Sequence, residues 1–549
     1  MKTSILAAAT ALASFVTGKN DFRSLGRLLP PLENGDVHAE AFAAAAVTTT
    51  GSAFFTQLLD HDDPSKGTFQ QKYWWNSEFW AGPGSPVVFF TPGEAAAAPY
   101  GSYLTNVTVS GLFAQEVQGA VILFEHRYYG DSSPYDTLDA ETLQLLTLHQ
   151  SMQDFTYFAN TAALPFDINH SSNANKAPWV FTGGSYSGAL AAWTEKLFPG
   201  TFWAYHASSA PVEAIYDYWQ YFAPIQEGMP KNCSSVSISL TEVHHNLTVE
   251  KDITAVVEHM DKVFMKGTDA EKLALKTQFG LESLEHNDDV MGVLEYGPWL
   301  WQSNSFSTGY SDFFQFCDAI EGVEAGAAVT PDANGIGLEK ALPNYAKWVN
   351  ETQIPGSCQN YGYTDERETK CFDTYDETNI LFTDRGVNNV ALLQWQWMLC
   401  NEPFGYWQDG APRHETTIVS RLITGDYWQR QCGLFFPTVN GFTYASNISA
   451  DNNVHQVNKH TEGWRLEDTT RLIWTNGQYD PWKTSGMSSE YRPGGPFPGT
   501  EAAPLQIIPG GFHCSDLRLK NGQYNAGAQQ VIDNEVAQIV KWVAEYQKK

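Results

Sequence analysis

The chain has few charged residues, and basic ones are especially scarce. Only 17% of its 549 residues are charged, and 33 Lys and Arg stand against 62 Asp and Glu, giving a formal net charge of −29. A surface this negative repels nucleic acids and anionic membranes, so neither is expected as a partner. The excess of carboxyl groups fits either a protein that works at low pH or the ordinary solubility of a secreted protein.

Long apolar runs are absent beyond the N-terminus. Residues 1–18, MKTSILAAATALASFVTG, have one early lysine, a short apolar run and a small-residue cleavage site, which is typical of a secretory signal peptide. No later stretch approaches the ~18 uninterrupted apolar residues of a membrane span. We therefore expect an exported protein that is secreted or held in an acidic vacuolar or lysosome-like compartment.

Cysteine pairs with metal-site spacing are also lacking. None of the seven cysteines forms a CxxC or a Cys/His pattern, so we expect no metal and no cofactor. Disulfides are the expected state, with three bridges at most and one thiol left over. Nothing in the sequence indicates an oligomeric state. Six N-x-S/T sequons are candidates for glycosylation: Asn106, Asn169, Asn232, Asn246, Asn350 and Asn447.

Short apolar segments that end in glycine-rich turns occur near both ends of the chain. They predict strands over 87–90, 121–124, 179–181, 471–474 and 505–508, and the spacing over 139–160 predicts a helix. Fully apolar strands that alternate with helices indicate a parallel sheet covered on both faces. The middle of the chain has helical periodicity instead, for example over 250–280, and contains most of the cysteines.

The stretch FTGGSYSGALAAW, residues 181–193, places two serines between a strand and a helix. Centred on Ser185, it matches four of the five positions of G-x-S-x-G, with Ser187 in place of the last glycine. That motif is the strand-to-helix turn on which α/β-hydrolases present their nucleophile. Ser185 is therefore the predicted nucleophile, and Ser187 is a small residue in a crowded position.

An acid and a histidine follow two later strands in the order that this fold requires. Asp480 comes after the strand at 471–474, and His513 comes after the strand at 505–508. The acid orients the histidine, which takes the proton of the serine. Asp516 is too close in sequence to His513 to orient it in the usual way. The predicted triad is Ser185, Asp480 and His513.

Two backbone N–H groups must stabilise the oxyanion of the tetrahedral intermediate. One is expected from Tyr186, directly after the nucleophile, and the other from Gly93 or Glu94 in the loop after an early strand. Glu94 has two other interpretations, as a counter-charge for a substrate amine or as a solvated turn residue.

Together these elements predict an α/β-hydrolase core with a mostly helical cap domain inserted between the nucleophile and the acid. After the signal peptide, residues 19–45 are expected to form a pro-segment or an N-terminal arm. The expected core comprises 46–215 and 436–549, and the expected disulfide-containing cap comprises 216–435.

Several motifs in combination resemble one family of serine peptidases. Residues 183–193, Glu-His-Arg-Tyr-Tyr-Gly at 125–130, Asn-Gly-Gln-Tyr-Asp-Pro-Trp at 476–482 and the late histidine resemble the Pro-Xaa carboxypeptidases and dipeptidyl-peptidase II. The chain looks most like the secreted fungal acid prolyl endoproteases within that family. Ser187, where animal members usually have glycine, and Cys514-Ser515, in place of an apolar stretch, depart from the pattern.

The resemblance implies cleavage after proline at acidic pH, with the triad on the residues named above and proline-containing peptides or proteins as substrates. It also implies that Trp482 lines the proline pocket, which suits a compact ring without an N–H. Trp395, Trp397, Met398 and Phe404 are further candidates or ordinary core residues. An endopeptidase is favoured over an exopeptidase. An esterase and a non-catalytic binding protein of the same fold are the remaining alternatives.

Overall fold

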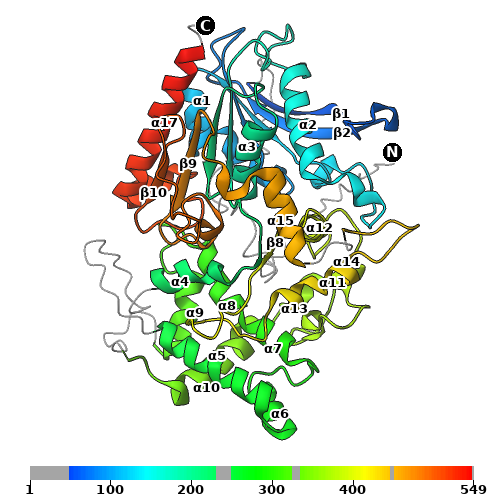
Figure 1. Ribbon diagram of the computed structural model, residues 1–549, viewed down its shortest axis with the longest axis vertical. Helices are drawn as coiled ribbons and strands as arrows, with labels where there is room; N and C mark the ends of the chain where they lie inside the picture. Colours follow the sequence, from blue (N-terminus) through cyan, green and yellow to red (C-terminus); the bar gives the residue numbers. More distant parts are fainter. Residues whose placement is uncertain (1–48, 230–248, 324–333, 446–449, 547–549) are drawn as a thin grey trace, which may run out of the picture.

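A central sheet of eight strands is built from the first and last parts of the chain (Figure 1). The computed structural model describes residues 49–229, 249–323, 334–445 and 450–546. The strand order is β1-β2-β4-β3-β5-β6-β9-β10; β1 and β2 run antiparallel to their neighbours, and the other strands are parallel. The strands are β1 (Thr50–Leu58), β2 (Thr68–Asn76), β3 (Val87–Phe90), β4 (Ala120–Phe124), β5 (Trp179–Gly184), β6 (Ala204–Ser208), β9 (Leu472–Gly477) and β10 (Leu505–Ile508).

Helices cover both faces of this sheet because its strands are apolar on both sides. In β3, Val87 and Phe89 belong to one buried core, and Val88 and Phe90 belong to another. This follows from the alternation of side chains along a strand. The first core is closed by α2 and α3, the second by α1 and α17 (Figure 1). The predicted α/β-hydrolase fold is confirmed. The core helices are α1 (Val109–Glu116), α2 (Leu148–Thr161), α3 (Tyr186–Leu197), α16 (Leu519–Tyr524) and α17 (Ala526–Tyr546).

The five expected strands are all present, but the helix expected over 139–160 is wrong in its first part. Thr147 caps α2 by accepting a hydrogen bond from the Gln150 N–H at 3.2 Å, so the α-helix begins at Leu148. Residues 142–145 form a separate 3-10 turn. The apolar spacing continues through the break and hides it. Sequence reasoning also missed β1, β2 and β6.

The middle of the chain forms a second layer below the sheet (Figure 1). It contains a two-stranded parallel sheet of β7 (Ile215–Asp217) and β8 (Gly405–Trp407). The helices expected within 250–280 are confirmed as α5 and α6. The helices of this part are α4 (Ala223–Gly228), α5 (Val249–Lys266), α6 (Asp269–Gln278), α7 (Asn287–Leu294), α8 (Tyr296–Trp299), α9 (Asp312–Glu321), α10 (Leu338–Trp348), α11 (Ile380–Thr383), α12 (Leu393–Asn401), α13 (Gly425–Gln429), α14 (Cys432–Phe435) and α15 (Ala450–Thr461).

Two disulfides fasten the middle part of the chain: Cys358–Cys371 and Cys400–Cys432, the second of which joins α12 to α14. Cys514 is a buried free thiol in the core. Cys233 lies outside the described residues, as do the expected signal peptide and residues 19–45. Among the helices that the structure describes, none combines the length and apolarity needed to cross a membrane.

The predicted glycosylation sites differ in accessibility. Asn106 and Asn169 are exposed. The Asn350 amide instead donates to the carbonyl oxygens of Gln278 at 3.0 Å and Ala346 at 2.9 Å, so a glycan, which replaces one of the two amide hydrogens, would break at least one of these hydrogen bonds. The remaining three sequons, Asn232, Asn246 and Asn447, lie outside the described residues.

Candidate active site

Ser185 occupies a strained turn between β5 and α3. Its φ of +57° and ψ of −134° lie in a region that non-glycine residues rarely adopt. The turn is held by a 2.9 Å hydrogen bond from the Ser185 N–H to the Ser208 carbonyl oxygen of β6. A Cβ on Gly183 would lie 2.3 Å from the Ser187 carbonyl oxygen, so only glycine fits there. These are the features of a nucleophile elbow.

Ser187 is engaged in holding this turn against β3. Its buried Oγ donates a 2.6 Å hydrogen bond to the Thr91 carbonyl oxygen, just after β3. The hydroxyl at the position of the motif's last glycine therefore adds a hydrogen bond. Its engagement with the backbone leaves Ser185 as the serine presented by the elbow.

Asp480 and His513 meet at the carboxyl ends of the neighbouring strands β9 and β10. His513 Nδ1 lies 2.9 Å from Asp480 Oδ1, and both side chains are buried. The carboxylate also accepts hydrogen bonds from the Trp482 N–H at 3.0 Å and from Asn476 Nδ2 at 3.2 Å. The two loops are tied together by a 2.8 Å hydrogen bond from the Tyr479 N–H to the Gly511 carbonyl oxygen. This geometry fixes the imidazole ring.

The charge state of His513 is set by opposing effects. Burial disfavours the imidazolium, but Cys514 and Asp480 outweigh burial and raise the pKa of His513 well above its usual value. Burial also raises the pKa of the Cys514 thiol, which keeps the thiol neutral. Because a neutral thiol does not stabilise the imidazolium by charge, the Asp480 carboxylate is the main cause of the raised pKa of His513. Among the described residues, His513 Nε2 has no hydrogen-bond partner. Nε2 can therefore take a proton from a reacting group when the imidazole is neutral.

The loop after β3 lies directly against the elbow. Gly93 has a φ of +75°, and a Cβ there would be 3.1 Å from the Tyr186 ring and 3.3 Å from the Ser187 nitrogen. The Gly93 N–H donates to Thr91 Oγ1 at 3.3 Å. The Tyr186 N–H belongs to the first residue of α3, where backbone donors have no partner within the helix.

Glu94 follows in the same loop and is only 1% exposed. Burial raises the pKa of its carboxyl group to about 8, although its own backbone and the nearby His513 lower it. Within the described part of the chain, Glu94 Oε2 has no hydrogen-bond partner. Glu94 is therefore a neutral acid at acidic pH, and it is not the solvated turn residue that one interpretation of the sequence allowed.

The motif at 125–130 supports these loops. The Glu125 carboxylate accepts hydrogen bonds from the Ala97 N–H at 2.8 Å and from Ser132 Oγ at 2.7 Å. His126 Nε2 lies 3.3 Å from the Tyr186 hydroxyl. The motif thus connects the loop that contains Glu94 and the start of α3 to one buried segment.

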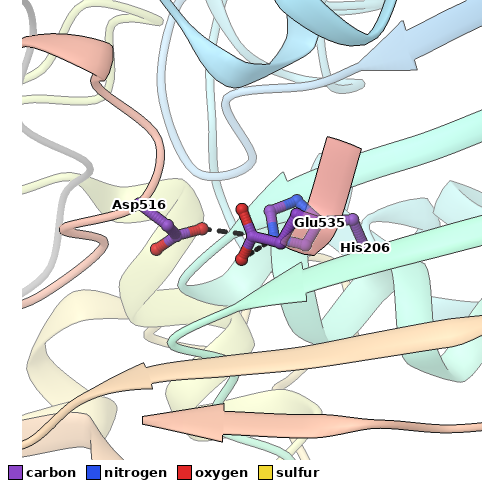
Figure 2. A group of neighbouring side chains, drawn as sticks. All are labelled: His206, Asp516 and Glu535. Carbon is purple, nitrogen blue, oxygen red and sulfur yellow. Dashed lines mark ion pairs between the residues drawn. The ribbon is translucent and has the colours of Figure 1, made fainter. Parts of the chain in front are cut away.

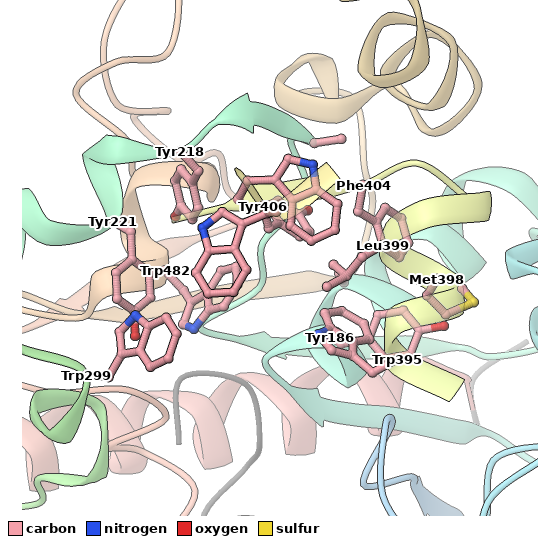
Figure 3. Packing of buried hydrophobic residues seen from close by; sticks show 14 of the residues in the cluster. Tyr186, Tyr218, Tyr221, Trp299, Trp395, Met398, Leu399, Phe404, Tyr406 and Trp482 are labelled. Carbon is pink, nitrogen blue, oxygen red and sulfur yellow. The ribbon is translucent and has the colours of Figure 1, made fainter. Parts of the chain in front are cut away.

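Trp482, two residues after Asp480, is enclosed by tyrosine rings (Figure 3). The ring centroids of Tyr218, Tyr221 and Tyr406 lie 5.6, 5.5 and 5.3 Å from that of the indole. All four side chains are buried. The three tyrosines were missed by sequence reasoning, because they come from segments far from Trp482 in the chain and have no motif of their own.

A second aromatic group contacts the ring of Tyr186 (Figure 3). Trp395 of α12 lies 5.3 Å from it and Phe404 lies 6.1 Å from it. Trp397, the other tryptophan of α12, makes its contacts elsewhere: its Nε1 donates to the Leu146 carbonyl oxygen at 3.1 Å, and its ring packs on Phe436 at 5.0 Å.

Met398 is buried on α12 next to these residues, as Figure 3 shows. Of the two tryptophans of α12, Trp395 contacts the ring of Tyr186. Trp397 has the contacts of a core residue.

His206, Asp516 and Glu535 form a buried charge cluster that sequence reasoning missed (Figure 2). His206 Nε2 is 3.2 Å from Asp516 Oδ2 and 3.3 Å from Glu535 Oε1. Burial opposes a charge on His206, but Glu535 and Asp516 outweigh it and raise the pKa of His206 to about 10. These residue types could hold a metal ion. Here the imidazolium supplies the positive charge that such an ion would supply.

This cluster connects to the elbow through β6. Ser208 Oγ donates to Asp516 Oδ1 at 2.6 Å, and the Ser208 carbonyl oxygen accepts the Ser185 N–H. Asp516 pairs with His206, whereas His513 pairs with Asp480.

The sequence that builds this site matches one family of serine peptidases. The family model for serine carboxypeptidase S28 matches residues 57–527. The chain belongs to the serine carboxypeptidase S28 family. As an S28 member it is a serine peptidase and therefore acts on peptides, which confirms the family resemblance and the predicted enzyme class.

Individual S28 relatives agree with this assignment. The chain is 40% identical to the serine protease vicPa of Bipolaris victoriae over 90% of this chain and 89% of that protein. It is 30% identical to the human thymus-specific serine protease over 86% of this chain and 82% of that one. It is 29% identical to the "Probable extracellular serine carboxypeptidase" of Arthroderma benhamiae over 83% of this chain and 60% of that one.

Solved structures give weaker similarity. An arylesterase shares 12% identity and a TM-score of 0.21 over 35% of this chain and 52% of that one. Hypothetical protein PA2218 of Pseudomonas aeruginosa shares 12% identity and a TM-score of 0.28 over 93% and 99%. These scores are low, and the fold assignment rests on the strand order.

Proposed function

We propose that Ser185, Asp480 and His513 are the catalytic triad of this S28 peptidase. Ser185 Oγ attacks the substrate carbonyl carbon while His513 Nε2 takes its proton, and Asp480 holds the imidazole through Nδ1. Collapse of the intermediate breaks the C–N bond, and His513 returns the proton to the leaving amine. Water then attacks the acyl-enzyme while His513 takes a proton from the water, and His513 returns that proton to Ser185 Oγ as the ester bond breaks. The strained elbow and the 2.9 Å Asp480–His513 contact support this assignment.

The oxyanion is stabilised by the Tyr186 N–H and by the loop that contains Gly93 and Glu94. The Gly93 N–H donates to Thr91 Oγ1, and the backbone of Glu94 interacts with its own carboxyl group, so both residues of this loop are candidates for the second donor. The close approach of Gly93 to Tyr186 supports this, since it brings the two backbone segments together.

The peptide bond that is cleaved follows proline. The observation that carries this proposal is the aromatic enclosure of Trp482, two residues from the proposed acid. A pyrrolidine ring is apolar and has no N–H, so aromatic side chains recognise it by shape. The resemblance to proline-specific peptidases supports the same specificity.

The proposed mode is endopeptidase action by a secreted enzyme. A dipeptidyl peptidase needs a negative group to hold the substrate amino terminus, and Glu94 is neutral below its raised pKa of about 8. This disfavours Glu94 as a preformed counter-charge. Secretion is supported by residues 1–18 and by the extracellular description of the Arthroderma relative.

The proposed working pH is acidic, and two observations bear on it in opposite directions. Buried carboxyl groups such as Glu94 favour the folded protein when they are protonated. His513 is a base only when neutral, so its raised pKa lowers the activity at the acid end of the range. A pH–rate profile locates the balance between them.

A proline-containing peptide blocked at both ends tests the mode and the specificity. After incubation at about pH 4.5 and about pH 7, mass spectrometry should detect internal cleavage after proline, which disappears in Ser185→Ala. Release of terminal fragments from unblocked peptides alone would favour the exopeptidase alternative. Turnover of short-chain esters without any peptide cleavage would favour the esterase.

A further inference from the structure

Gln302 is a buried amide that links the middle part of the chain to the loop of the proposed acid. It lies in the 3-10 turn Leu300–Ser303, directly after α8. Its Oε1 accepts two hydrogen bonds of 2.8 Å, from the Tyr221 hydroxyl and from Trp482 Nε1. An indole N–H can only donate, so the atom that faces Trp482 must be the amide oxygen. The orientation of the amide is therefore fixed.

The fixed orientation leaves the NH₂ group of Gln302 facing another direction. The residue is only 2% exposed, and its Nε2 has no hydrogen-bond partner among the residues that the structure describes. A buried donor without an acceptor costs folding free energy. That cost is recovered if a ligand brings an oxygen to this position.

The surroundings define which ligand atom this is. Gln302 contacts Trp482 and Tyr221, two of the rings that form the proposed proline site. A proline residue within a peptide has no N–H, and two carbonyl groups flank its ring. The carbonyl of proline itself is the scissile one and belongs at the Tyr186 N–H. The other carbonyl, on the ring nitrogen, comes from the preceding residue.

We propose that Gln302 Nε2 donates a hydrogen bond to the carbonyl oxygen of the residue that precedes proline. This makes Gln302 a specificity-determining residue for an acylated proline, and it rests on the proposed post-proline activity. Trp482 then recognises the ring by shape, while Gln302 recognises the amide on the ring nitrogen. Because Oε1 also holds the Trp482 indole, the same side chain couples the two contacts.

Gln302→Glu is the matched variant because its carboxylate keeps both acceptor contacts and the side-chain length but has no NH₂. With an X-Pro amide substrate we expect kcat/KM to fall about 10- to 100-fold at about pH 7. The loss should shrink at acidic pH, where a protonated carboxyl group can donate again. Gln302→Met, which removes donor and acceptor together, should show no such recovery.

A substrate with a thioamide before proline completes the test, because sulfur is a poorer acceptor than oxygen. The wild type should cleave it several-fold more slowly than the oxygen substrate, and Gln302→Glu at about pH 7 should cleave both at similar rates. An equal thioamide penalty in both enzymes would overturn the proposal, as would an unchanged kcat/KM in Gln302→Glu. If Gln302→Glu does not fold, Gln302→Met replaces it in this comparison of two enzymes with the oxygen and thioamide substrates.

Two controls separate this inference from the proposed function. Labelling of Ser185 by a fluorophosphonate counts intact active sites in every variant. If the wild type labels but cleaves no proline peptide, the proposed specificity fails as well. If it cleaves after proline without any thioamide penalty, only the role of Gln302 fails.

Discussion

Trp301 donates a 2.8 Å hydrogen bond from its indole Nε1 to the carbonyl oxygen of Tyr479, the residue directly before Asp480. The same indole packs against Phe512, directly before His513, with ring centroids 5.2 Å apart. One side chain from the middle part of the chain therefore contacts both loops that contain the proposed acid and base. The position of these loops depends on a residue that is far from them in sequence.

Trp301→Phe should weaken this support without emptying the space. The phenyl ring keeps the contact with Phe512, while the Tyr479 carbonyl oxygen loses its donor, at a cost of about 1 kcal/mol in stability. We expect kcat/KM to fall about three- to tenfold because the acid loop is less well held. Urea unfolding and peptide hydrolysis measure the two effects. Trp299→Phe is the matched control, since Trp299 Nε1 has no hydrogen-bond partner among the described residues.

The two serines of the elbow should respond very differently to replacement by alanine. Ser185→Ala should reduce kcat by about a millionfold, because it removes the proposed nucleophile, while leaving the melting temperature nearly unchanged. Ser187→Ala should cost about 1 kcal/mol of stability, because its hydrogen bond to Thr91 is lost, and less than a tenfold change in kcat. Fluorophosphonate labelling that survives Ser185→Ala would contradict the assignment.

Stability should be highest at acidic pH because several buried carboxyl groups prefer to be protonated. Burial raises the pKa of Glu94 to about 8 and, together with the nearby Asp217, that of Asp409 to about 9. The folded protein thus binds more protons than the unfolded chain between about pH 4 and 9, and unfolding becomes easier as the pH rises through this range. Asp409 alone should contribute a loss of about 3 kcal/mol or more.

Calorimetry across this pH range checks the expectation. Asp409→Asn cannot titrate, so its melting temperature should fall less between about pH 5 and 9 than that of the wild type. The exposed Asp136 provides the control, because Asp136→Asn should leave the pH dependence unchanged. A wild-type stability that rises with pH over this range would show that other groups dominate.

The cluster of His206, Asp516 and Glu535 should behave as a unit. His206→Gln leaves two buried carboxylates without a cation and should cost about 3 to 5 kcal/mol. Adding Glu535→Gln removes one of those charges and should recover part of the loss, which a double-mutant cycle measures. Additive effects of the two substitutions would argue against the ion pairs.

The pH dependence of this cluster has the same direction as that of the carboxyl groups but a different cause, because here the protonated form is charged and is stabilised by two carboxylates. The pKa of His206 is raised from 6.5 to about 10, so the folded protein again holds a proton that the unfolded chain loses. The contribution to stability is complete below about pH 6.5 and is lost as the pH rises through about 10. Wild type and His206→Gln should therefore converge in stability at high pH.

The sequence predicted the residues that one local motif or one strand end identifies. The G-x-S-x-G pattern led to Ser185, and the strands before Asp480 and His513 placed both at the carboxyl edge of a parallel sheet. The sequence did not predict contacts between segments that are far apart in the chain. Nothing near Tyr218, Tyr221 or Tyr406 marks them as neighbours of Trp482, and nothing near Gln302 shows that its amide is fixed by them.

Only the tertiary structure distinguishes candidates that the sequence leaves equivalent. The sequence does not distinguish Trp395 from Trp397 as pocket residues. Residues two apart on a helix point in nearly opposite directions, and the packing of α12 places Trp395 against Tyr186. Likewise the sequence left three interpretations of Glu94 open, and the burial that raises its pKa to about 8 exists only in the folded protein.

The sequence by itself determined the fold class and the order of Ser185, Asp480 and His513, because strand alternation, turn chemistry and chain order are local properties. Only the tertiary structure decided which side chains surround them, which carboxyl groups are neutral and that the Gln302 amide donor has no partner among the described residues. Those properties depend on the dielectric environment and on partners supplied by other segments, and neither exists until the chain has packed.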